Sequence, residues 1–323
     1  MTSHRSSTHL FRVLVSLFLV TTGCALDGAA PDSEPTSEQV QLDSVFRWAS
    51  EQRISTWASE MTPALGALNG FVYMVHAGCC DTSLWWGRYD GTSWAGDWQI
   101  PNQWSSSPPS LAAFAGSLYV TYTHGTSVLY TIYNPNTNTW SDPSGLAFTS
   151  NASPAIAAFG TKLYFVYPDT ATAQLQQRTM DTSNNLTLAT PLGGQFSFSP
   201  VALAVYQGRL YVAHAASGGL VYNSSDGMNW GADLRIPGGL NNANQDSPGT
   251  PTLAAFNNVL HLMHKEPTTG DTIWWSELNT TTWTVEQALN ELGQPSLAAG
   301  ATKLVMSHGS SAANHAIFYT TFQ

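Results

Sequence analysis

The chain has 323 residues and a formal net charge of −10, with 11 Lys and Arg against 21 Asp and Glu. An acidic protein with so few cations is not expected to bind nucleic acid or an anionic membrane surface through its charge. Only 10% of the residues are charged, while Ser, Thr, Asn and Trp are frequent. This composition suits an exported protein that contacts neutral polar ligands.

The first 23 residues have the pattern of an export signal, because Arg5 and Arg12 precede the apolar run Val13 to Val20. The junction before Cys24 resembles a bacterial lipobox, in which the Cys is lipidated and becomes the mature N-terminus. Thr21 stands where Leu or a similar residue is usual, so an ordinary secretory peptide cut nearby stays an alternative. Cleavage before Cys24 removes two of the 11 cations and no acid, which leaves nine cations, 21 acids and a formal charge of −12.

Residues 24–43 contain Pro31 and Pro35 among Ser, Glu and Asp, a composition typical of a flexible tether. No later segment is long and apolar enough to cross a bilayer. We therefore expect a cell-envelope lipoprotein of the periplasm or outer membrane, or an extracellular protein. Its membrane contact would be the lipid anchor alone, and residues 44–323 would form the folded domain.

A block of about 46 residues recurs six times. The segments LAAFAGSLYVTY (Leu111 to Tyr122) and IAAFGTKLYFVY (Ile156 to Tyr167) show the shared template. Equivalent positions are separated by 46, 45, 47, 50 and 44 residues, and they are Val72, Leu118, Leu163, Leu210, Leu260 and Leu304. Periods of this length indicate blades, solenoids or arrays.

Each block is predicted to form four short strands. The second block illustrates the pattern: an inner strand Leu111 to Phe114, a turn at Ala115-Gly116, a second strand Leu118 to Tyr122 and a third strand Leu129 to Tyr133. An outer strand follows and usually opens with Trp, as at Trp94, Trp140, Trp230 and Trp283. The Ala-rich inner strands suit a crowded central axis, and no sustained helical period is present.

The sixth block ends after three strands, at Ala316 to Gln323. Its missing outer strand is found at the other end of the domain, because Trp48 to Ile54 aligns with Trp94 to Ile100 at an offset of 46. A ring closed in this way leaves no long exposed sheet edge. The sequence predicts an all-β, six-bladed β-propeller of four-stranded blades, in which the N-terminal strand closes the last blade.

In such a propeller one face carries the longer loops, and it is the default binding face. The last residue of the second strand lies just under this face, and in the six blades it is His76, Tyr122, Tyr167, His214, His264 and His308. These side chains could contact a ligand. Alternatively, each His could lock one blade to the next by bonding a loop carbonyl. His261 and His264 point to opposite sides of their strand, so they cannot chelate one metal, and no metal site is predicted.

Two rows of aromatic residues mark the third strands. The first row is Trp85, Leu129, Gln176, Val221, Trp274 and Phe318, and the second is Trp86, Tyr130, Gln177, Tyr222, Trp275 and Tyr319. Alternation sends the rows to opposite sides of each blade, so one row should pack between sheets and the other should be partly exposed. Because blade 3 carries Gln176 and Gln177, it is expected to hold the weakest site.

Blade-to-blade loops are expected to carry four further aromatic residues, Trp57, Trp104, Phe148 and Phe196. Exposed aromatic planes beside hydroxyl-rich and amide-rich loops suit the apolar face and the hydroxyls of a sugar. The predicted ligand-binding residues are His76, Asp81, Trp86, Trp104, Tyr130, His214, Tyr222, His264, Trp275, His308 and Tyr319.

Cys79 and Cys80 are adjacent in a predicted loop. Neighbouring Cα atoms lie about 3.8 Å apart, shorter than the usual disulfide span, so a bond between the two would be strained. A redox-labile pair and two plain loop thiols both remain open, and no zinc spacing is present. The segments Asp90 to Trp94 and Ser225 to Trp230 resemble degenerate Asp-boxes, whose Asp and Gly serve tight turns rather than catalysis.

The ring of 46-residue repeats, its closure through the N-terminal strand and the aromatic third strands together resemble the fucose-specific lectin superfamily, whose propeller is sialidase-like. The resemblance covers nearly all of residues 45–323. It implies monosaccharide pockets between adjacent blades, with Trp and Tyr side chains as stacking surfaces. Lectins of this family also use an Arg and a Glu, but the arginines of this chain do not recur at one blade position, so fucose specificity is not carried over.

The leading functional hypothesis is a multivalent carbohydrate-binding protein without cofactor or catalytic residues, in which weak sites act together. One alternative is a sialidase-like glycoside hydrolase, which would need an Arg cluster, a Tyr nucleophile and acids near the axis. Another is a protein-interaction propeller without sugar affinity. The sequence leaves the oligomeric state open.

Overall fold

The computed structural model describes residues 48–197, 199–237, 249–265, 271–310 and 314–323. The predicted signal segment 1–23, the lipidation residue Cys24 and the tether 24–43 lie outside these residues. All regular structure in the described ranges is β-strand. No helix there could span a membrane.

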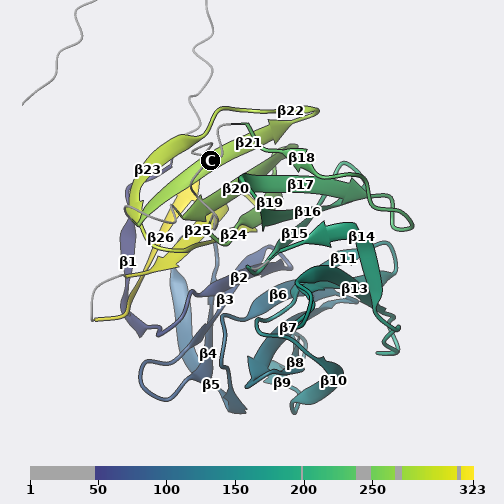
Figure 1. Ribbon diagram of the computed structural model, residues 1–323. Coiled ribbons are helices and arrows are strands. Elements are labelled where there is room, and N and C mark those ends of the chain that lie inside the picture. The colour runs from purple at the N-terminus through teal and green to yellow at the C-terminus, as the bar shows by residue number, and fades with distance from the viewer. Residues whose placement is uncertain (1–47, 198, 238–248, 266–270, 311–313) are drawn as a thin grey trace, which may run out of the picture. The chain divides into compact units, whose positions relative to one another are not determined.

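Six antiparallel sheets of four main strands repeat along the chain (Figure 1). Blade 1 consists of β2 (Ala64–Leu68), β3 (Phe71–Ala77), β4 (Ser83–Tyr89) and β5 (Trp94–Trp104). Blade 2 consists of β6 (Ser110–Phe114), β7 (Ser117–His124), β8 (Ser127–Asn134), the short β9 (Thr139–Trp140) and β10 (Ser144–Thr149). Blade 3 consists of β11 (Ala155–Phe159), β12 (Lys162–Pro168), β13 (Gln174–Met180) and β14 (Thr190–Phe196).

The second half of the chain repeats this plan. Blade 4 consists of β15 (Ala202–Tyr206), β16 (Arg209–Ala216), β17 (Gly219–Ser225) and β18 (Leu234–Arg235). Blade 5 consists of β19 (Thr252–Phe256), β20 (Val259–Lys265), β21 (Thr272–Asn279), the short β22 (Thr282–Trp283) and β23 (Gln287–Leu292). Blade 6 consists of β24 (Pro295–Ala299), β25 (Leu304–Gly309), β26 (Ala316–Phe322) and β1 (Gln52–Ala58).

The inner hairpins of blades 1, 2, 4 and 5 turn through two residues that both have positive φ. Ala115 and Gly116 have φ of 50° and 78°, and Asn69 and Gly70 have 51° and 82°. Positive φ at both central residues is the geometry that lets a two-residue turn follow the twist of its strands. The tight turn predicted at Ala115-Gly116 is therefore confirmed.

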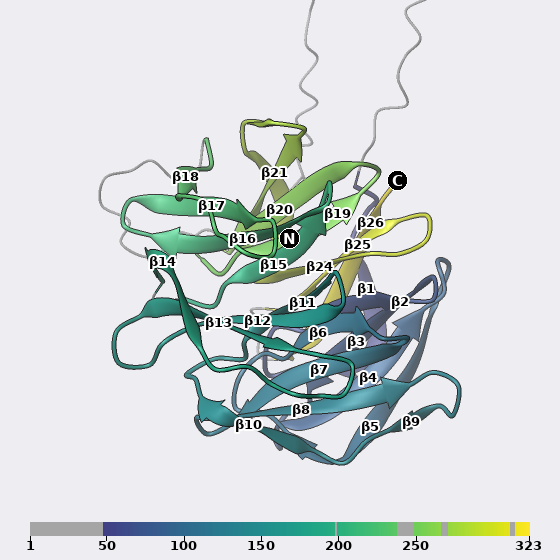
Figure 2. The same cartoon turned by 90° about the vertical axis from the view of Figure 1, so that its right-hand side faces the viewer.

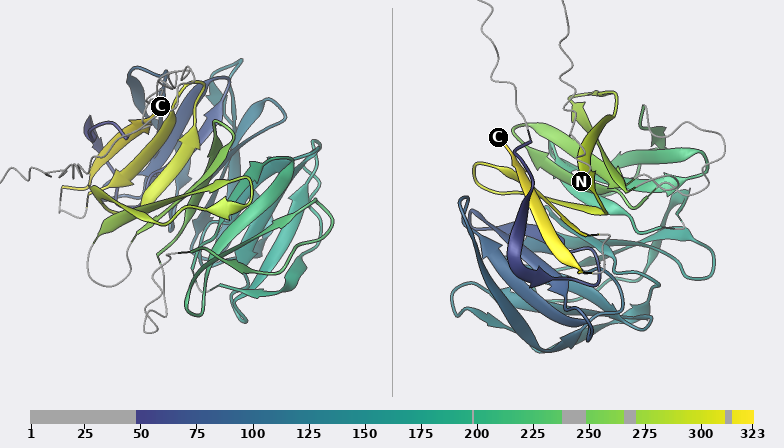
Figure 3. Two further views of the ribbon diagram at one scale, coloured as in Figure 1. Left: turned by 90° about the horizontal axis from the view of Figure 1, so that it is seen from above. Right: turned by 90° about the vertical axis from the view of Figure 1, so that its left-hand side faces the viewer.

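The ring closes as predicted. Each inner strand contacts the inner strands of its two neighbours, and β24 of blade 6 contacts β2 of blade 1 (Figures 1 and 2). Strand β1 pairs antiparallel with β26, with Gln52 opposite Tyr319 and Arg53 opposite Phe318. The right-hand view of Figure 3 shows the two strands, purple and yellow, side by side. The molecule is thus a six-bladed β-propeller whose last blade contains both ends of the described chain.

Aromatic layers hold adjacent blades together. The second aromatic row of the third strands faces the next blade along the chain, where it meets the Trp near the start of the outer-strand segment. Ring centroids lie 5.7 Å apart for Trp86 and Trp140, and 5.4 Å apart for Tyr222 and Trp283. At the closure, Tyr319 lies 5.8 Å from Trp94. In blades 2 and 5 the Trp belongs to a short separate segment, β9 or β22, and not to the main outer strand.

Candidate functional site

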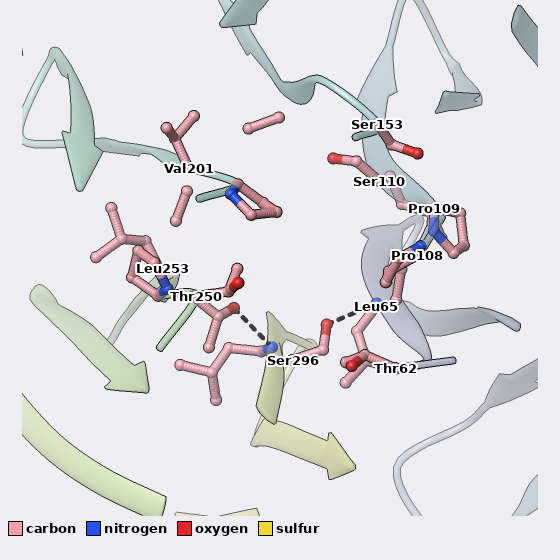
Figure 4. A pocket seen from close by; sticks show the side chains of 18 of the residues that line it. Thr62, Leu65, Pro108, Pro109, Ser110, Ser153, Val201, Thr250, Leu253 and Ser296 are labelled. Atoms are coloured by element: carbon pink, nitrogen blue, oxygen red, sulfur yellow. Dashed lines mark hydrogen bonds between the residues drawn. The ribbon is translucent and has the colours of Figure 1, made fainter. Parts of the chain in front are cut away.

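A funnel of about 230 Å³ lies on the axis, where the inner strands begin. All six blades line it with the residues at or just before their inner strands (Figure 4). Five blades contribute prolines, which are Pro63, Pro108, Pro109, Pro200, Pro251 and Pro295. No Asp, Glu, Lys or Arg is among the residues that line the funnel, so its surface is neutral. We call this side of the ring, which carries the longer loops, the loop face.

Hydroxyl groups in the funnel join neighbouring blades. Leu65 N donates to Ser296 Oγ at 3.0 Å, and Leu297 N donates to Thr252 Oγ1 at 3.1 Å (Figure 4). In each bond, a backbone N–H at the free edge of an inner strand finds its acceptor in a side-chain hydroxyl of the preceding blade. The hydroxyls therefore have a structural role in closing the ring.

A second hollow of about 480 Å³ lies beside the funnel, on the loop face of blades 2 to 4. Its polar lining consists of Ser106, Ser107, Asn151, Asp169, Thr170, Thr172, Ser197 and Ser199. Asp169 is the charged member, and its Oδ1 accepts hydrogen bonds from the Thr172 hydroxyl at 2.8 Å and the Thr172 amide at 2.9 Å. These bonds lower the pKa of Asp169. The sequence signal was weakest for blade 3, so sequence reasoning missed this hollow.

Two predicted site residues, Asp81 and Trp104, are related through Ser83 of blade 1, which bonds the first and lies opposite the second. Trp104 is the last residue of β5 and lies opposite Ser83 in the sheet. Asp81 Oδ1 accepts hydrogen bonds from the Ser83 hydroxyl at 2.7 Å and the Ser83 amide at 3.0 Å, and these bonds lower the pKa of Asp81. Trp104 is 45% exposed, and its Nε1 donates to Nε2 of His124 in blade 2 at 3.3 Å. We call Asp81, Trp104 and His124 the Trp104 cluster.

The four aromatic residues expected in blade-to-blade loops lie instead in the outer strands β1, β5, β10 and β14. Outer strands run further toward the loop face than the repeat template suggests. Trp57 is buried, and Phe148 is half-buried against Tyr167, with ring centroids 4.4 Å apart. Only Trp104 and Phe196 present large exposed surfaces, Phe196 at 48%.

The four histidines at the ends of the second strands are internal. All four are buried, and in each the Nε2 atom contacts a carboxylate of the same blade. The pairs are His76–Asp97 at 3.0 Å, His214–Asp233 at 3.1 Å, His264–Glu286 at 2.8 Å and His308–Glu51 at 2.6 Å. Ligand contact by these histidines stays a prediction: in this structure they are buried, and each Nε2 atom already contacts a carboxylate. The alternative of a lock between blades is corrected, since each pair joins the second strand to the outer segment of its own blade.

A β-bulge shows how the acid reaches its histidine in blade 1. Trp98 lies opposite Trp86 and Gly96 lies opposite Gly87, so Asp97 is the extra residue of the outer strand. Its φ is 81°. A bulge of this kind re-aims one side chain, and here it directs the carboxylate across β4 to His76 in β3.

The acids of these pairs were not predicted, although the sequence carries a signal for them. Each lies three residues after the outer-segment Trp, in a Trp-x-x-Asp/Glu pattern, namely Asp97, Asp233, Glu286 and Glu51. In blades 2 and 3 the equivalent residues are Pro143 and Ala189, and the histidine is replaced by Tyr122 or Tyr167. Comparing the repeats with one another would have found the pairing.

The aromatic row predicted to stack on sugars lies in the layers between blades. Trp86 and Tyr319 are buried, Tyr222 contacts Trp283 as described above, and Tyr130 stacks on Tyr119 with centroids 6.3 Å apart. Trp275 Nε1 donates to His261 Nδ1 at 3.3 Å. Sugar stacking by this row stays a prediction: Trp86 and Tyr319 are buried, whereas Tyr130, Tyr222 and Trp275 are half-buried against neighbouring aromatic rings.

The opposite face of the ring carries the tight turns. Asp90 Oδ1 accepts the amides of Ser93 and Thr92, both at 2.8 Å, and these bonds lower its pKa. Asp226 accepts the amides of Asn229 and Met228 in the same way, both at 2.9 Å. The turn role expected for the Asp-box-like segments is confirmed. Within the described residues, no group of three or more His, Cys, Asp or Glu could hold a metal ion.

Sequence comparisons found no matching family model and no matching curated protein. Among solved structures, the chain is similar to Trypanosoma rangeli sialidase, with 12% identity and a TM-score of 0.59 over 85% of this chain and 59% of that one. It is also similar to a protein of unknown function from Dyadobacter fermentans DSM 18053, with 10% identity and a TM-score of 0.63 over 86% and 99%. A third similar structure is the SapL1 lectin in complex with alpha methyl fucoside, with 13% identity and a TM-score of 0.56 over 79% and 95%.

These likenesses define the class of fold, a β-propeller architecture that occurs both in a lectin and in a sialidase. The chain spans 59% of the length of the sialidase that it matches. At identities of 10–13%, the shared fold does not by itself assign a function.

Proposed function

We propose that this protein is an exported, lectin-like carbohydrate-binding protein whose principal site is the Trp104 cluster. The observation that carries the proposal is an indole that is 45% exposed on the loop face and donates its N–H to the imidazole of His124 in the next blade. A sugar ring offers an apolar face to such an indole and hydroxyls to the polar groups at its edge.

The hydrogen bonds of the cluster leave groups free for a ligand. Because His124 Nε2 accepts from Trp104, the neutral imidazole carries its hydrogen on Nδ1 and can donate it to a sugar oxygen. Asp81 uses Oδ1 for Ser83, and its second oxygen can accept from a sugar hydroxyl. This arrangement favours a neutral, hydroxyl-rich ligand.

Further weak sites would make binding multivalent. Phe196 ends the outer strand of blade 3 at the position that Trp104 holds in blade 1, and it is similarly exposed. The polar hollow over blades 2 to 4 lies on the same face. Several weak sites on one rigid ring raise avidity toward a clustered glycan without any tight single contact.

A sialidase-like hydrolase is the less favoured alternative. Its carboxylated substrate would call for arginines near the axis, but no arginine lines the funnel or the second hollow. Arg178 bonds the Tyr167 hydroxyl at 3.1 Å, and Arg209 bonds the Ser224 hydroxyl at 2.9 Å. These contacts support binding over hydrolysis.

A glycan array on the full chain, followed by titration of the best ligand, tests the proposal. Trp104→Ala should weaken binding roughly 10-fold, which corresponds to about 1.4 kcal/mol. Trp98→Ala is the matched control, because Trp98 lies in the same strand and is 47% exposed but packs on Trp86 outside the cluster. The control should bind like the wild type.

Equal binding by wild type and Trp104→Ala would refute the assignment of the site. If no glycan binds, and a protein partner is captured that free sugars do not displace, the protein-interaction alternative replaces the proposal. The eight large exposed apolar side chains of the described residues would then be the surface to mutate: Trp98, Trp104, Leu188, Phe196, Met228, Leu234, Val285 and Leu292.

Export and anchoring are part of the proposal. Removal of residues 1–23 and lipidation of Cys24 would tether the propeller to a membrane. Labelled palmitate should enter the wild-type protein in a bacterial host and should not enter Cys24→Ala, which should leave the membrane fraction. Label that persists in Cys24→Ala, or an N-terminal peptide that still contains residues 1–23, would contradict this.

A further inference from the structure

Cys79 and Cys80 lie on the loop face, in the loop between β3 and β4. Both are exposed, and their sulfur atoms are 3.1 Å apart. The side chains of neighbouring residues in an extended strand point in opposite directions. The loop therefore adopts a special conformation that brings the two thiols to the same side.

Backbone geometry and anchoring account for this conformation. Cys80 has φ of 87° and Thr82 has φ of 56°, values that residues with a side chain seldom adopt. Hydrogen bonds hold the loop on both sides, from Gly78 N to Ser83 O at 2.7 Å and from Ser105 N to Thr82 O at 2.9 Å. The loop is thus fixed in a shape in which the two sulfurs face each other.

Glycine at position 78 is required by this packing. A Cβ there would lie 2.8 Å from Trp85 Nε1 and 2.9 Å from Asp81 Oδ1. The loop consequently lies directly against a third-strand tryptophan.

We propose that Cys79 and Cys80 form a reversible dithiol–disulfide couple on the loop face. A low-molecular-weight disulfide such as oxidised glutathione is the oxidant. One cysteine thiolate attacks it, giving a mixed disulfide and one glutathione. The second cysteine then displaces the other glutathione. Overall, the two cysteines lose two electrons and two protons, one protein S–S bond forms, and the glutathione disulfide is reduced to two thiols.

The geometry makes such a bond both attainable and easy to reverse. A disulfide is about 2.05 Å long, so the sulfurs have to approach by about 1 Å. Adjacent Cα atoms are closer than the usual disulfide span, and the resulting strain makes the bond more reducible. Exposed or strained disulfides are the labile ones, with less negative reduction potentials than structural disulfides.

A chain of hydrogen bonds connects the pair to the tryptophans of blade 1. Asp81 follows Cys80 directly and accepts from Ser83, and Ser83 Oγ accepts from Trp85 Nε1 at 2.8 Å. Ser83 also lies opposite Trp104. Closing the ring between Cys79 and Cys80 would shift this loop, so oxidation should change the environment of Trp85.

The resting thiols are expected to react slowly at neutral pH. The hydrogen bond with Cys80, then desolvation and the charges of Cys80, Glu60 and Asp81 raise the pKa of Cys79. Because the thiolate is the reactive form, exchange should become faster as the pH rises.

The test equilibrates the full chain in glutathione buffers of increasing oxidised fraction, followed by acid quench, alkylation and peptide mass spectrometry. In the oxidising buffers the peptide with Cys79 and Cys80 should be two hydrogen atoms lighter and carry no alkyl group. A dithiol reductant should restore two alkylations. Cys79→Ser and Cys80→Ser are matched controls that should never give the lighter peptide. Peptide-level analysis separates the pair from Cys24.

Tryptophan fluorescence gives a second readout. Oxidation should shift the emission of the wild type, and the shift should shrink by at least half in Trp85→Phe. Two outcomes would overturn the proposal: a peptide that stays doubly alkylated in the most oxidising buffer, or one that forms only mixed or intermolecular disulfides. No sugar enters either assay, so its result is independent of the proposed function.

Discussion

Blades 1, 4, 5 and 6 differ from blades 2 and 3 in how the second strand is joined to the outer segment. The first four use a buried histidine and a carboxylate at 2.6–3.1 Å. Blades 2 and 3 have Tyr122 and Tyr167 at the histidine position, and Pro143 and Ala189 at the position of the acid. Both members of the pair are thus present or absent together. Among the six blades, a histidine at the end of the second strand occurs only where the outer segment supplies an acid.

The energetic reason is the cost of burying one polar group without the other. A buried imidazole beside Pro143 or Ala189 would lack its acceptor, and an unpaired buried polar group costs about 1–3 kcal/mol. A carboxylate opposite a tyrosine could still accept a hydrogen bond, but it would bury charge without a cation. Tyr in place of His removes the imidazole that needs the acid; the Tyr167 hydroxyl accepts from Arg178, whereas the Tyr122 hydroxyl is buried without a partner in the described structure.

The four pairs also differ among themselves. In blades 5 and 6 the second ring nitrogen faces a backbone oxygen, with His264 Nδ1 at 3.2 Å from Lys265 O and His308 Nδ1 at 3.2 Å from Gly309 O. In blades 1 and 4 the Nδ1 atoms of His76 and His214 are buried without a hydrogen-bond partner in the described structure. Blade 5 should therefore depend most on its pair, since its acid is buried as well.

The largest effect is expected for His264→Ala. The variant would leave the carboxylate of Glu286, whose side chain is only 3% exposed, without its partner. Loss of one member of a buried pair costs about 3–5 kcal/mol. The free energy of unfolding, measured by urea denaturation, should fall by this amount. A loss below about 1 kcal/mol would show that the pair contributes little.

His214→Ala is the graded control in blade 4. Desolvation opposes ionisation of Asp233, but hydrogen bonds from His214 and Asn223 outweigh it and lower its pKa. Asn223 Nδ2 donates to this carboxylate at 2.8 Å and is kept in the variant, and the side chain of Asp233 is 28% exposed. The loss should be about 1–2 kcal/mol. A loss equal to that of His264→Ala would contradict the ranking by burial.

His261 sharpens the comparison, because it is a buried histidine outside the Trp-x-x-acid pattern. Burial lowers its pKa from 6.5 to about 4. Between these values the unfolded chain binds a proton that the folded protein does not, so stability falls as the pH drops from 6.5 toward 4. His261→Phe removes this penalty while keeping an aromatic ring beside Phe322 and Trp275.

When the pH is lowered from 7 to 4.5, the wild type should therefore lose about 2–3 kcal/mol more unfolding free energy than His261→Phe loses. Burial raises the pKa of Glu277, whose stabilising contribution is lost as the pH rises, and its Oε1 lies 3.3 Å from His261 Nδ1, so both proteins are compared in a Glu277→Gln background. Urea denaturation at the two pH values measures the difference. A difference that does not change with pH would mean that His261 titrates normally in the folded protein.

The repeat spacing was sufficient to predict the fold. The six equivalent positions from Val72 to Leu304 defined the blades, and the alignment of Trp48 to Ile54 with Trp94 to Ile100 predicted the β1–β26 pairing that closes the ring. Strand alternation also predicted that the two aromatic rows lie on opposite sides of each blade. It could not say which row the next blade covers, because that depends on the twist and stagger of whole sheets.

The site was harder to predict for a different physical reason. Repetition identifies what each blade needs for packing, and His76 and Trp86 repeat because they serve the core. Trp104 is exposed and has its aromatic counterpart only in Phe196. Its partner His124 lies in the next blade and carries no repeat signal. The proposed site therefore consists of loop-face residues that the repeat does not mark.

The smallest effects are expected in blades 2 and 3, which carry Tyr122 and Tyr167 at the histidine position. They test whether these blades lack a polar side-chain bond from the end of the second strand. The Tyr122 hydroxyl is buried and has no hydrogen-bond partner in the described structure, so Tyr122→Phe should leave stability unchanged or raise it by up to about 1 kcal/mol. The Tyr167 hydroxyl accepts from Arg178 Nε, so Tyr167→Phe should cost about 0.5–1.5 kcal/mol. Thermal unfolding of both variants beside the wild type resolves the sign. A clear loss in Tyr122→Phe would mean that its hydroxyl is hydrogen-bonded, by water or protein, and that blade 2 carries a polar connection of its own after all.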